Sequence, residues 1–184
     1  MQNRIVSNIS FIIGIFAMLL LIYAISFLSL GSMLQRLLLF AGALMLLAVA
    51  YAHKQRVLIA VELVVVTGGI VSLLPISLAV VLITMTTVSL ILIGYLFKVG
   101  HYKKEPIGIF GTLGFLMLAF GYAMNFGANT LYAAVGLGLG AVLLMLYSTM
   151  HYYLYKVRVQ IIWAVLNAAF AISPLLFLLS IKAL

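Results

Sequence analysis

Cysteine is absent from this chain of 184 residues, and only two residues, Glu62 and Glu105, carry a carboxylate side chain. Without cysteine the chain can have no disulfide bond, thiolate metal ligand or thiol nucleophile. Charged residues make up only 7% of the composition, whereas a soluble domain has about a quarter of its residues charged. The composition therefore excludes an ordinary water-soluble domain.

The chain consists mainly of apolar residues. Hydrophobic residues make up 67% of it, and its mean hydropathy is +1.38. Each apolar stretch is about 18 to 23 residues long, as an α-helix needs to cross a hydrocarbon layer of about 30 Å. We predict an all-α, polytopic helical membrane protein, with about seven transmembrane helices in one bundle and a single transmembrane domain over residues 1–184. The predicted spans are residues 9–30, 34–52, 57–74, 76–97, 107–126, 131–153 and 160–181.

Positive charges are distributed unevenly between the two sides of this threading. Arg36 and Lys182 fall on one side and the other eight Lys and Arg residues on the opposite side, and cytoplasmic loops carry the excess of positive charge. The eight residues are Arg4, Lys54, Arg56, Lys98, Lys103, Lys104, Lys156 and Arg158. We expect the N-terminus inside and the C-terminus outside, in a plasma (cytoplasmic) membrane. The formal net charge of +8 then favours contact with anionic lipids at the inner face, and we predict no nucleic-acid partner.

Glu62 interrupts an apolar run, residues 56–75. Counted from Arg56 at the interface, it lies about 9 Å into the hydrocarbon at about 1.5 Å per residue. A charged carboxylate facing lipid there costs about 2–3 kcal/mol, so we expect Glu62 to face protein. A structural interpretation makes it protonated, or paired with an inner-loop lysine such as Lys98 or Lys156.

A functional interpretation makes Glu62 and Thr67 a candidate ion or proton site. Thr67 lies deeper on the same span and is followed by Gly68 and Gly69. We expect this run to unwind locally, so that backbone carbonyls could join the acid in holding an ion. The sequence leaves the structural and functional interpretations open.

Few other polar side chains lie inside the predicted spans. Asn167 shares a stripe with small residues, so we expect it to hydrogen-bond to a neighbouring helix, although the same stripe could line a solute path. Hydroxyl groups can fold back onto their own helix and are weaker evidence for a path. The candidates for interhelical or path-lining roles are Asn167, Trp163, Asn125, Thr84 and Thr87.

Small residues in spans 107–126 and 131–153 predict the closest helix packing. They recur at spacings that let two helix backbones approach each other. The candidates for this packing are Gly108, Gly111, Gly114, Gly136 and Gly140. We expect these two spans to be the tightest-packed pair.

The three histidines, His53, His101 and His151, all fall at or near the inner boundary. Their spacing is typical of neither a paired-histidine site on facing helices nor a two-histidine site on one helix, so we predict no metal site and no cofactor. No nucleophile with a neighbouring base, glycine-rich phosphate loop or carboxylate pair is evident either. We therefore expect no enzymatic activity.

The motif Lys-x-Arg-Val occurs twice, at residues 54–57 and 156–159, and a further basic junction, residues 101–106, lies between the two copies. Duplication of an ancestral unit would explain the recurrence. A series of helical hairpins with positive inner loops would also repeat at twice the length of a span. Both explanations remain open at the level of sequence.

Two segments resemble parts of known membrane families. Residues 60–74, AVELVVVTGGIVSLL, look like the third-helix segment of the J-type membrane subunit of respiratory complex I, although Val66 stands where that family has an aromatic residue. Residues 161–172, IIWAVLNAAFAI, are similar through Trp163 and Asn167 to helices of seven-span vitamin-uptake transporters of the nicotinamide riboside type. The first likeness implies a subunit role and the second a transport role. Each ends with its segment, so no family is assigned.

Two functions are predicted, in order. The first is an integral membrane subunit of a larger respiratory or ion-translocating complex, with a structural or assembly role, because the spans contain few polar groups. The alternative is a small secondary transporter or channel for an ion or small solute, with Glu62 as the coupling or ion site. The expected partners are other membrane subunits or further copies of this chain. The thinly spread polar groups predict no continuous hydrated path through the isolated chain.

Overall fold

A computed structural model of the chain describes residues 2–27, 32–126 and 130–182. The regular secondary structure in these ranges is all α-helical, which confirms the predicted class. The helices in chain order are α1 (Gln2–Phe27), α2 (Met33–Ala52), α3 (Arg56–Ser72), α4 (Leu78–Lys98), α5 (His101–Lys104), α6 (Gly108–Phe126), α7 (Thr130–Tyr155) and α8 (Gln160–Lys182).

Five helices, α2, α4, α6, α7 and α8, are long and apolar enough to cross a membrane. This finding supports the predicted integral membrane protein, because several helices could cross a membrane. The apolar part described for α1, Asn8–Ala24, and the 17 residues of α3 fall short of the same length. The long helices begin and end close to the predicted spans, and residues 28–30 of the first predicted span lie outside the described residues.

Local sequence explains where several helices begin and end. Ser32 caps α2, because its side chain accepts a hydrogen bond from the backbone N–H of Gln35 at 3.2 Å. Pro75, which has no backbone N–H to donate, lies in the break between α3 and α4. After α4, Gly100 adopts a φ of 63°, a left-handed conformation that is open to glycine without strain, and the chain turns into α5.

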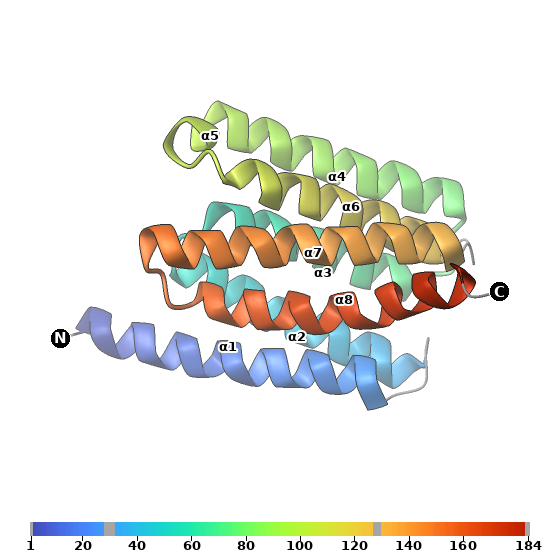
Figure 1. Cartoon of the computed structure of the whole chain (residues 1–184), viewed down its shortest axis with the longest axis horizontal. Helices are drawn as coiled ribbons and strands as arrows, with labels where there is room; N and C mark the ends of the chain where they lie inside the picture. Colours follow the sequence, from blue (N-terminus) through green and yellow to red (C-terminus); the bar gives the residue numbers. More distant parts are fainter. Residues whose placement is uncertain (1, 28–31, 127–129, 183–184) are drawn as a thin grey trace.

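The long helices lie side by side with their axes roughly parallel (Figure 1). α2 packs on α1 and α3, and α7 packs on α6 and α8. Contacts of α1 with α8 and of α3 with α6 close these six helices into a ring, and α4 lies outside the ring against α3 and α6. Buried apolar side chains, among them Leu46, Val64 and Leu144, form the core.

The ring consists of two three-helix units, α1–α3 and α6–α8, whose helices follow in the same order. The units meet through equivalent contacts, α1 with α8 and α3 with α6. The repeated Lys-x-Arg-Val motif lies between the last two helices of each unit, where Lys54 and Lys156 adopt left-handed conformations with φ of 55° and 56°. Val57 and Val159, the last residues of the motifs, are both buried. This arrangement favours duplication, because hairpin periodicity alone does not require equivalent units around one ring.

One end of the bundle carries most of the positive charge. The α2–α3 and α7–α8 junctions and α5 lie there together with the start of α1 (left in Figure 1), and we call it the basic end. Its described basic residues are Lys54, Arg56, Lys98, Lys103, Lys104, Lys156 and Arg158. Arg36 lies at the opposite end, where its Nη1 donates a hydrogen bond to the carbonyl of Ser72 at 2.7 Å.

Glycines bring the backbones of α6 and α7 together. A Cβ added to Gly136 would lie 2.7 Å from the backbone of Gly121, and one added to Gly140 would lie 2.9 Å from the carbonyl oxygen of Gly114. Larger side chains at these positions would therefore push the two helices apart.

Gly108 and Gly111 lie nearer the basic end and make room for other elements. A Cβ added to Gly108 would lie 2.6 Å from Nε2 of His101 in α5. Gly111 packs on Val57 of α3 and on the ring of Tyr147 of α7. The glycines of α6 therefore contact three elements rather than α7 alone.

Candidate functional site

Glu62 of α3 and Trp163 of α8 meet inside the ring. Both are buried, with exposed fractions of 3% and 1%, and Nε1 of Trp163 donates a hydrogen bond to Oε1 of Glu62 at 2.7 Å. The acid belongs to the first unit and the indole to the second, so this bond crosses the interface between the units. Glu62 faces protein, as expected.

The salt bridge from Glu62 to Lys98 or Lys156 that the sequence allowed is not formed. Both lysines are exposed at the basic end, and the ion pairs found among the described residues involve Glu105 instead. The indole N–H of Trp163 takes the place of a cation, because it can reach the acid from inside the ring.

Asn167 supports Trp163 from its own helix. Its Nδ2 donates a hydrogen bond to the carbonyl oxygen of Trp163 at 2.8 Å. This bond lies within α8, because the carbonyl four residues earlier is within reach of the amide; the expected bond to a neighbouring helix stays a prediction. Asn167 is buried and lies one turn beyond the Glu62–Trp163 pair.

The run from Thr67 to Gly69 does not unwind, so that expectation is wrong. α3 continues through these residues, and Oγ1 of Thr67 donates a hydrogen bond back to the carbonyl oxygen of Leu63 at 2.7 Å. The glycines make room for rings: a Cβ on Gly68 would lie 3.4 Å from Tyr122, and one on Gly69 would lie 3.1 Å from Phe40. The helix stays regular because aromatic packing fills the space that the glycines leave.

The other predicted path-lining residues lie away from Glu62. Thr87 and Asn125 are exposed and Thr84 is half-buried. The two threonines belong to α4, which lies outside the six-helix ring. These three residues do not join the Glu62–Trp163 pair.

The other acid, Glu105, lies at the basic end between α5 and α6 and has three partners. The hydroxyl of Tyr147 donates a hydrogen bond to Oε1 of Glu105 at 2.7 Å. Nε2 of His151 lies 3.4 Å and Nε2 of His101 lies 3.7 Å from the same oxygen. The sequence analysis missed this cluster, although the spacing of His101 and Glu105 by four residues was a signal for it.

Electrostatics at the basic end follow from this packing. Burial alone would raise the pKa of Glu105, but hydrogen bonds from His151 and Tyr147 and the positive charge available on the imidazoles hold the pKa below its usual range. Burial lowers the pKa of His101 below its usual value, against the opposing pull of Glu105. The resting pair at neutral pH is therefore an ionised Glu105 and a neutral His101.

Further polar side chains lie between these two acids. Nε2 of Gln160, the first residue of α8, donates a hydrogen bond to Oε1 of Gln55 at 2.9 Å. Oε1 of Gln160, Oγ of Ser148 and Nδ1 of His151 are buried and have no hydrogen-bond partner among the described residues. Buried polar atoms of this kind normally bind ordered water.

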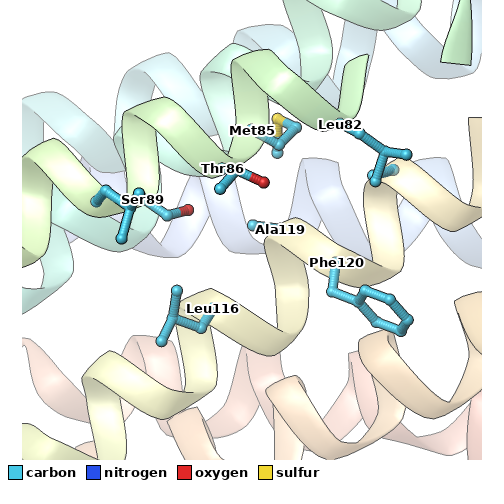
Figure 2. A pocket seen from close by; sticks show the side chains of 9 residues that line it. Leu82, Met85, Thr86, Ser89, Leu116, Ala119 and Phe120 are labelled. Atoms are coloured by element: carbon cyan, nitrogen blue, oxygen red, sulfur yellow. The ribbon is translucent and has the colours of Figure 1, made fainter. Parts of the chain in front are cut away.

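An apolar cavity of about 120 Å³ lies elsewhere, between α4 and α6 (Figure 2). Leu82, Met85 and Phe120 are among the side chains that line it. Ser89 is the buried polar residue of this lining, and its Oγ has no partner among the described residues. The cavity is separate from the Glu62–Trp163 pair.

The chemistry available at the Glu62–Trp163 pair is that of one carboxyl group, one indole and a nearby amide. Such a group can bind or release a proton, or accept hydrogen bonds from a solute. The described residues contain no group of three or more His, Cys, Asp or Glu side chains that could hold a metal ion.

No protein-family model, no curated protein and no solved structure matches this chain.

Proposed function

We propose that this chain crosses a plasma membrane seven times, through α1–α4 and α6–α8, with the N-terminus inside and the C-terminus outside. The gathering of Lys and Arg at the basic end supports this orientation, because that end then meets the cytoplasm and anionic headgroups. α1 and α3 pack side by side with the five helices that are long and apolar enough to cross a membrane, which supports their inclusion.

A cysteine placed at Lys104 tests this threading cleanly, because the chain has no cysteine of its own. In intact cells the substituted residue should resist a membrane-impermeant thiol reagent and react after the membrane is opened. Labelling from outside intact cells would contradict the orientation.

We further propose that the protein is a small secondary transporter, with the Glu62–Trp163 pair as the coupling site. The observation that carries this proposal is the hydrogen bond between these two buried residues across the interface of the two units. Transporters built from repeated units bind substrate and coupling ions near the middle of the membrane, where the repeats meet. A bond across that interface can form in one arrangement of the units and break in another.

The charge of the site favours a small cation. Glu62 is the one acid inside the ring, and no Lys or Arg is buried among the described residues. An anion would therefore find no compensating charge, whereas a cation could pair with the carboxylate and with the face of an aromatic ring. An unpaired carboxylate is costly in this position, so Glu62 should carry a proton when no cation is bound. Cation binding would then release that proton.

Purified protein in liposomes loaded with a pH-indicator dye tests this exchange directly. Gradients of Na⁺, K⁺ and tetramethylammonium would be imposed one at a time, in each direction. For at least one of these cations, protons should move in the direction opposite to the cation. Glu62→Gln keeps the shape of the side chain and an acceptor for Trp163 but cannot release a proton, so the flux should fall by about a hundredfold. Thr87→Val, on the exposed face of α4, should leave it unchanged.

Two results would overturn the transport proposal. One is the absence of proton movement with every cation of the series. The other is an equal flux in the wild type and in Glu62→Gln, which would mean that the acid is not the coupling group.

The second candidate is the structural subunit of a larger membrane complex, which the sequence alone ranked first. The apolar cavity between α4 and α6 favours it, because a side chain of a neighbouring helix could fill that space. The buried acid at the unit interface gives transport the higher rank. Mild-detergent purification from native membranes should yield a stable partner set if the subunit role is correct, and Leu82→Trp, which fills the cavity, should release those partners.

A further inference from the structure

A line of polar side chains leads from the basic end to Glu62. Where this line starts, at the basic end, Glu105 accepts the hydrogen bond from the Tyr147 hydroxyl at 2.7 Å. The side chain of Gln160 lies beside that hydroxyl. Gln160 precedes Trp163 by one turn of α8, about 4.5 Å along the helix axis, so the two side chains share a face. Trp163 in turn donates to Glu62.

Unpartnered atoms mark the middle of this line. Oε1 of Gln160 and Oγ of Ser148 are buried without a hydrogen-bond partner among the described residues, and Ser148 is the neighbour of Tyr147 in α7. Leaving such atoms unsatisfied costs about 1–3 kcal/mol each. A water molecule bound between them would remove this cost and would bridge Tyr147 to the interior of the ring.

We propose that Glu105, Tyr147, Gln160 and Ser148 form a proton path between the basic end and Glu62. The inference rests on the proposed function only in taking Glu62 as a group that exchanges its proton. Glu105 and Tyr147 carry the proton, whereas Gln160 and Ser148 are positioning residues that hold water. The path gives Glu62 access to one side of the membrane.

Each transfer along the path conserves protons. Glu105, once protonated from water at the basic end, gives its proton to the oxygen of Tyr147. Tyr147 at the same time releases its own hydroxyl proton to the water held by Gln160 and Ser148. From that water the proton passes along further water molecules beside Trp163 to the second carboxylate oxygen of Glu62, Oε2. Tyr147 is neutral before and after the transfer, so no charge stays behind.

The charged and titratable groups around Glu105, where the path begins, come from three elements. His101 belongs to α5, His151 and Tyr147 belong to α7, and Arg56 at the start of α3 acts electrostatically on His101. These groups keep the pKa of Glu105 low, so the carboxylate is ionised at neutral pH and holds a proton only transiently during transfer.

On the far side of Glu62, Tyr122 of α6 packs on Gly68 and interacts electrostatically with Glu62. Thr67 is bonded to the carbonyl of Leu63 and Asn167 to the carbonyl of Trp163, each within its own helix. The proposed path joins Glu62 to the basic end. This half-path is compatible with the expected lack of a continuous hydrated route.

Trp163 provides a built-in reporter, because it is the one tryptophan of the chain. Its indole N–H is bonded to Glu62, so its fluorescence should change when Glu62 gains or loses a proton. The test follows this fluorescence in lipid nanodiscs, first at equilibrium from about pH 4 to about pH 10 and then after rapid pH jumps. Glu62→Gln should abolish the pH-dependent change.

Variants of the path should change the rate and not the extent of this signal. Tyr147→Phe and Gln160→Leu should slow the response to a pH jump by about tenfold or more while the equilibrium amplitude is kept. Tyr102→Phe is the matched control. The hydroxyl of Tyr102 also makes a partly buried hydrogen bond at the basic end, to Oγ1 of Thr112 at 2.7 Å, but Tyr102 lies off the path. Its response should match the wild type.

Three outcomes would overturn the proton path. They are a Trp163 signal that does not change with pH, a signal that survives Glu62→Gln, and unchanged rates in both Tyr147→Phe and Gln160→Leu. Equal slowing in Tyr102→Phe would likewise assign the effect to general disturbance of the basic end. A path that passes these tests while liposome transport fails would separate this inference from the proposed function.

Discussion

Glu62 and Glu105 are the same residue type in two different settings. Glu62 is enclosed by two helical units, and its hydrogen-bond partner among the described residues is the neutral indole of Trp163. Glu105 lies at the basic end and is held by Tyr147 and two histidines. The difference shows how surroundings decide what an acid can do. The half-buried Glu105 is held as an ionised group by Tyr147 and two histidines, whereas one neutral donor leaves the buried Glu62 as a group whose protonation can change.

This difference also separates stability from function. The partners of Glu105 come from α5 and α7, so the carboxylate ties the α4–α6 connection to the second unit. The partner of Glu62 comes from the opposite unit of the ring, and that bond must break if the units move apart. We therefore expect Glu105 to matter most for folding and Glu62 to matter most for exchange.

The largest expected effect on stability is at Glu105. Glu105→Ala leaves the buried hydroxyl of Tyr147 without its acceptor and removes the carboxylate that faces His101 and His151, which should lower the free energy of unfolding by about 2–3 kcal/mol. Chemical unfolding in detergent micelles measures this change. Glu62→Gln is the matched comparison and should cost less than about 1 kcal/mol, because glutamine still accepts from Trp163. The reverse order of the two costs would contradict the separation of roles.

Trp163→Phe should have a smaller effect on stability. Phenylalanine keeps an aromatic side chain but is smaller than tryptophan and lacks the indole N–H, so Glu62 loses its donor and the free energy of unfolding should fall by about 1–2 kcal/mol. In the double variant with Glu62→Leu no polar group is left unpaired, and part of this loss should return. Equal stability of Trp163→Phe and the wild type would show that the bond between the units contributes nothing at rest.

Acid should weaken the basic end. The folded-state pKa of His101 lies below its usual value of 6.5, so the unfolded chain takes up a proton first as the pH falls through that value, and folding stability is lost. The lowered pKa of Glu105 acts in the same direction once the pH falls below its usual 4.5. The thermal midpoint should therefore drop by about 2–4 °C between about pH 7 and about pH 5.5.

His101→Gln is the control for this pH dependence. It removes the titrating imidazole, so the decline between neutral pH and pH 5.5 should become shallower. A thermal midpoint that rises on acidification would contradict the assigned sign.

The smallest effect is expected at Thr67. Its hydroxyl is bonded to the carbonyl of Leu63 within α3, so Thr67→Val should change the free energy of unfolding by no more than about 0.5 kcal/mol. The pH response of Trp163 fluorescence should also stay as in the wild type. A loss of that response in Thr67→Val would restore the threonine to the ion site that the sequence predicted.

The helices were predictable because the length and hydropathy of each apolar run act locally. The break at Pro75 and the turn at Gly100 are local too. The prediction that Glu62 faces protein followed from the cost of a charge in lipid, and it needed no knowledge of a partner.

The partners themselves could not be predicted in the same way. Trp163 is 101 residues from Glu62 and reaches it only because α1–α3 and α6–α8 close into one ring. Counting residues from the membrane interface placed Lys98 and Lys156 within reach of Glu62, but the side chains of both lysines are exposed at the basic end. Depth along a helix gives no information about which neighbour faces it.

The Glu105 cluster was hidden for a different reason. Its members come from α5, the following loop and α7, and each one alone is typical of an interfacial residue. The four-residue spacing of His101 and Glu105 indicates that these two side chains can meet. Tyr147, however, lies 42 residues away from Glu105 and inside an apolar span. Helix packing through Gly111 brings the Tyr147 ring into place.

Difference infrared spectroscopy of the carboxyl C=O stretch tests the central claim most directly, because it detects whether Glu62 exchanges a proton for a cation. Protein in lipid films would be compared before and after addition of the cation that drives proton movement in liposomes. We predict that the band of a protonated carboxyl group disappears on cation addition in the wild type and in Glu105→Gln, and that no such band is present in Glu62→Gln. A band that persists unchanged after cation addition, or that remains in Glu62→Gln, would contradict the account.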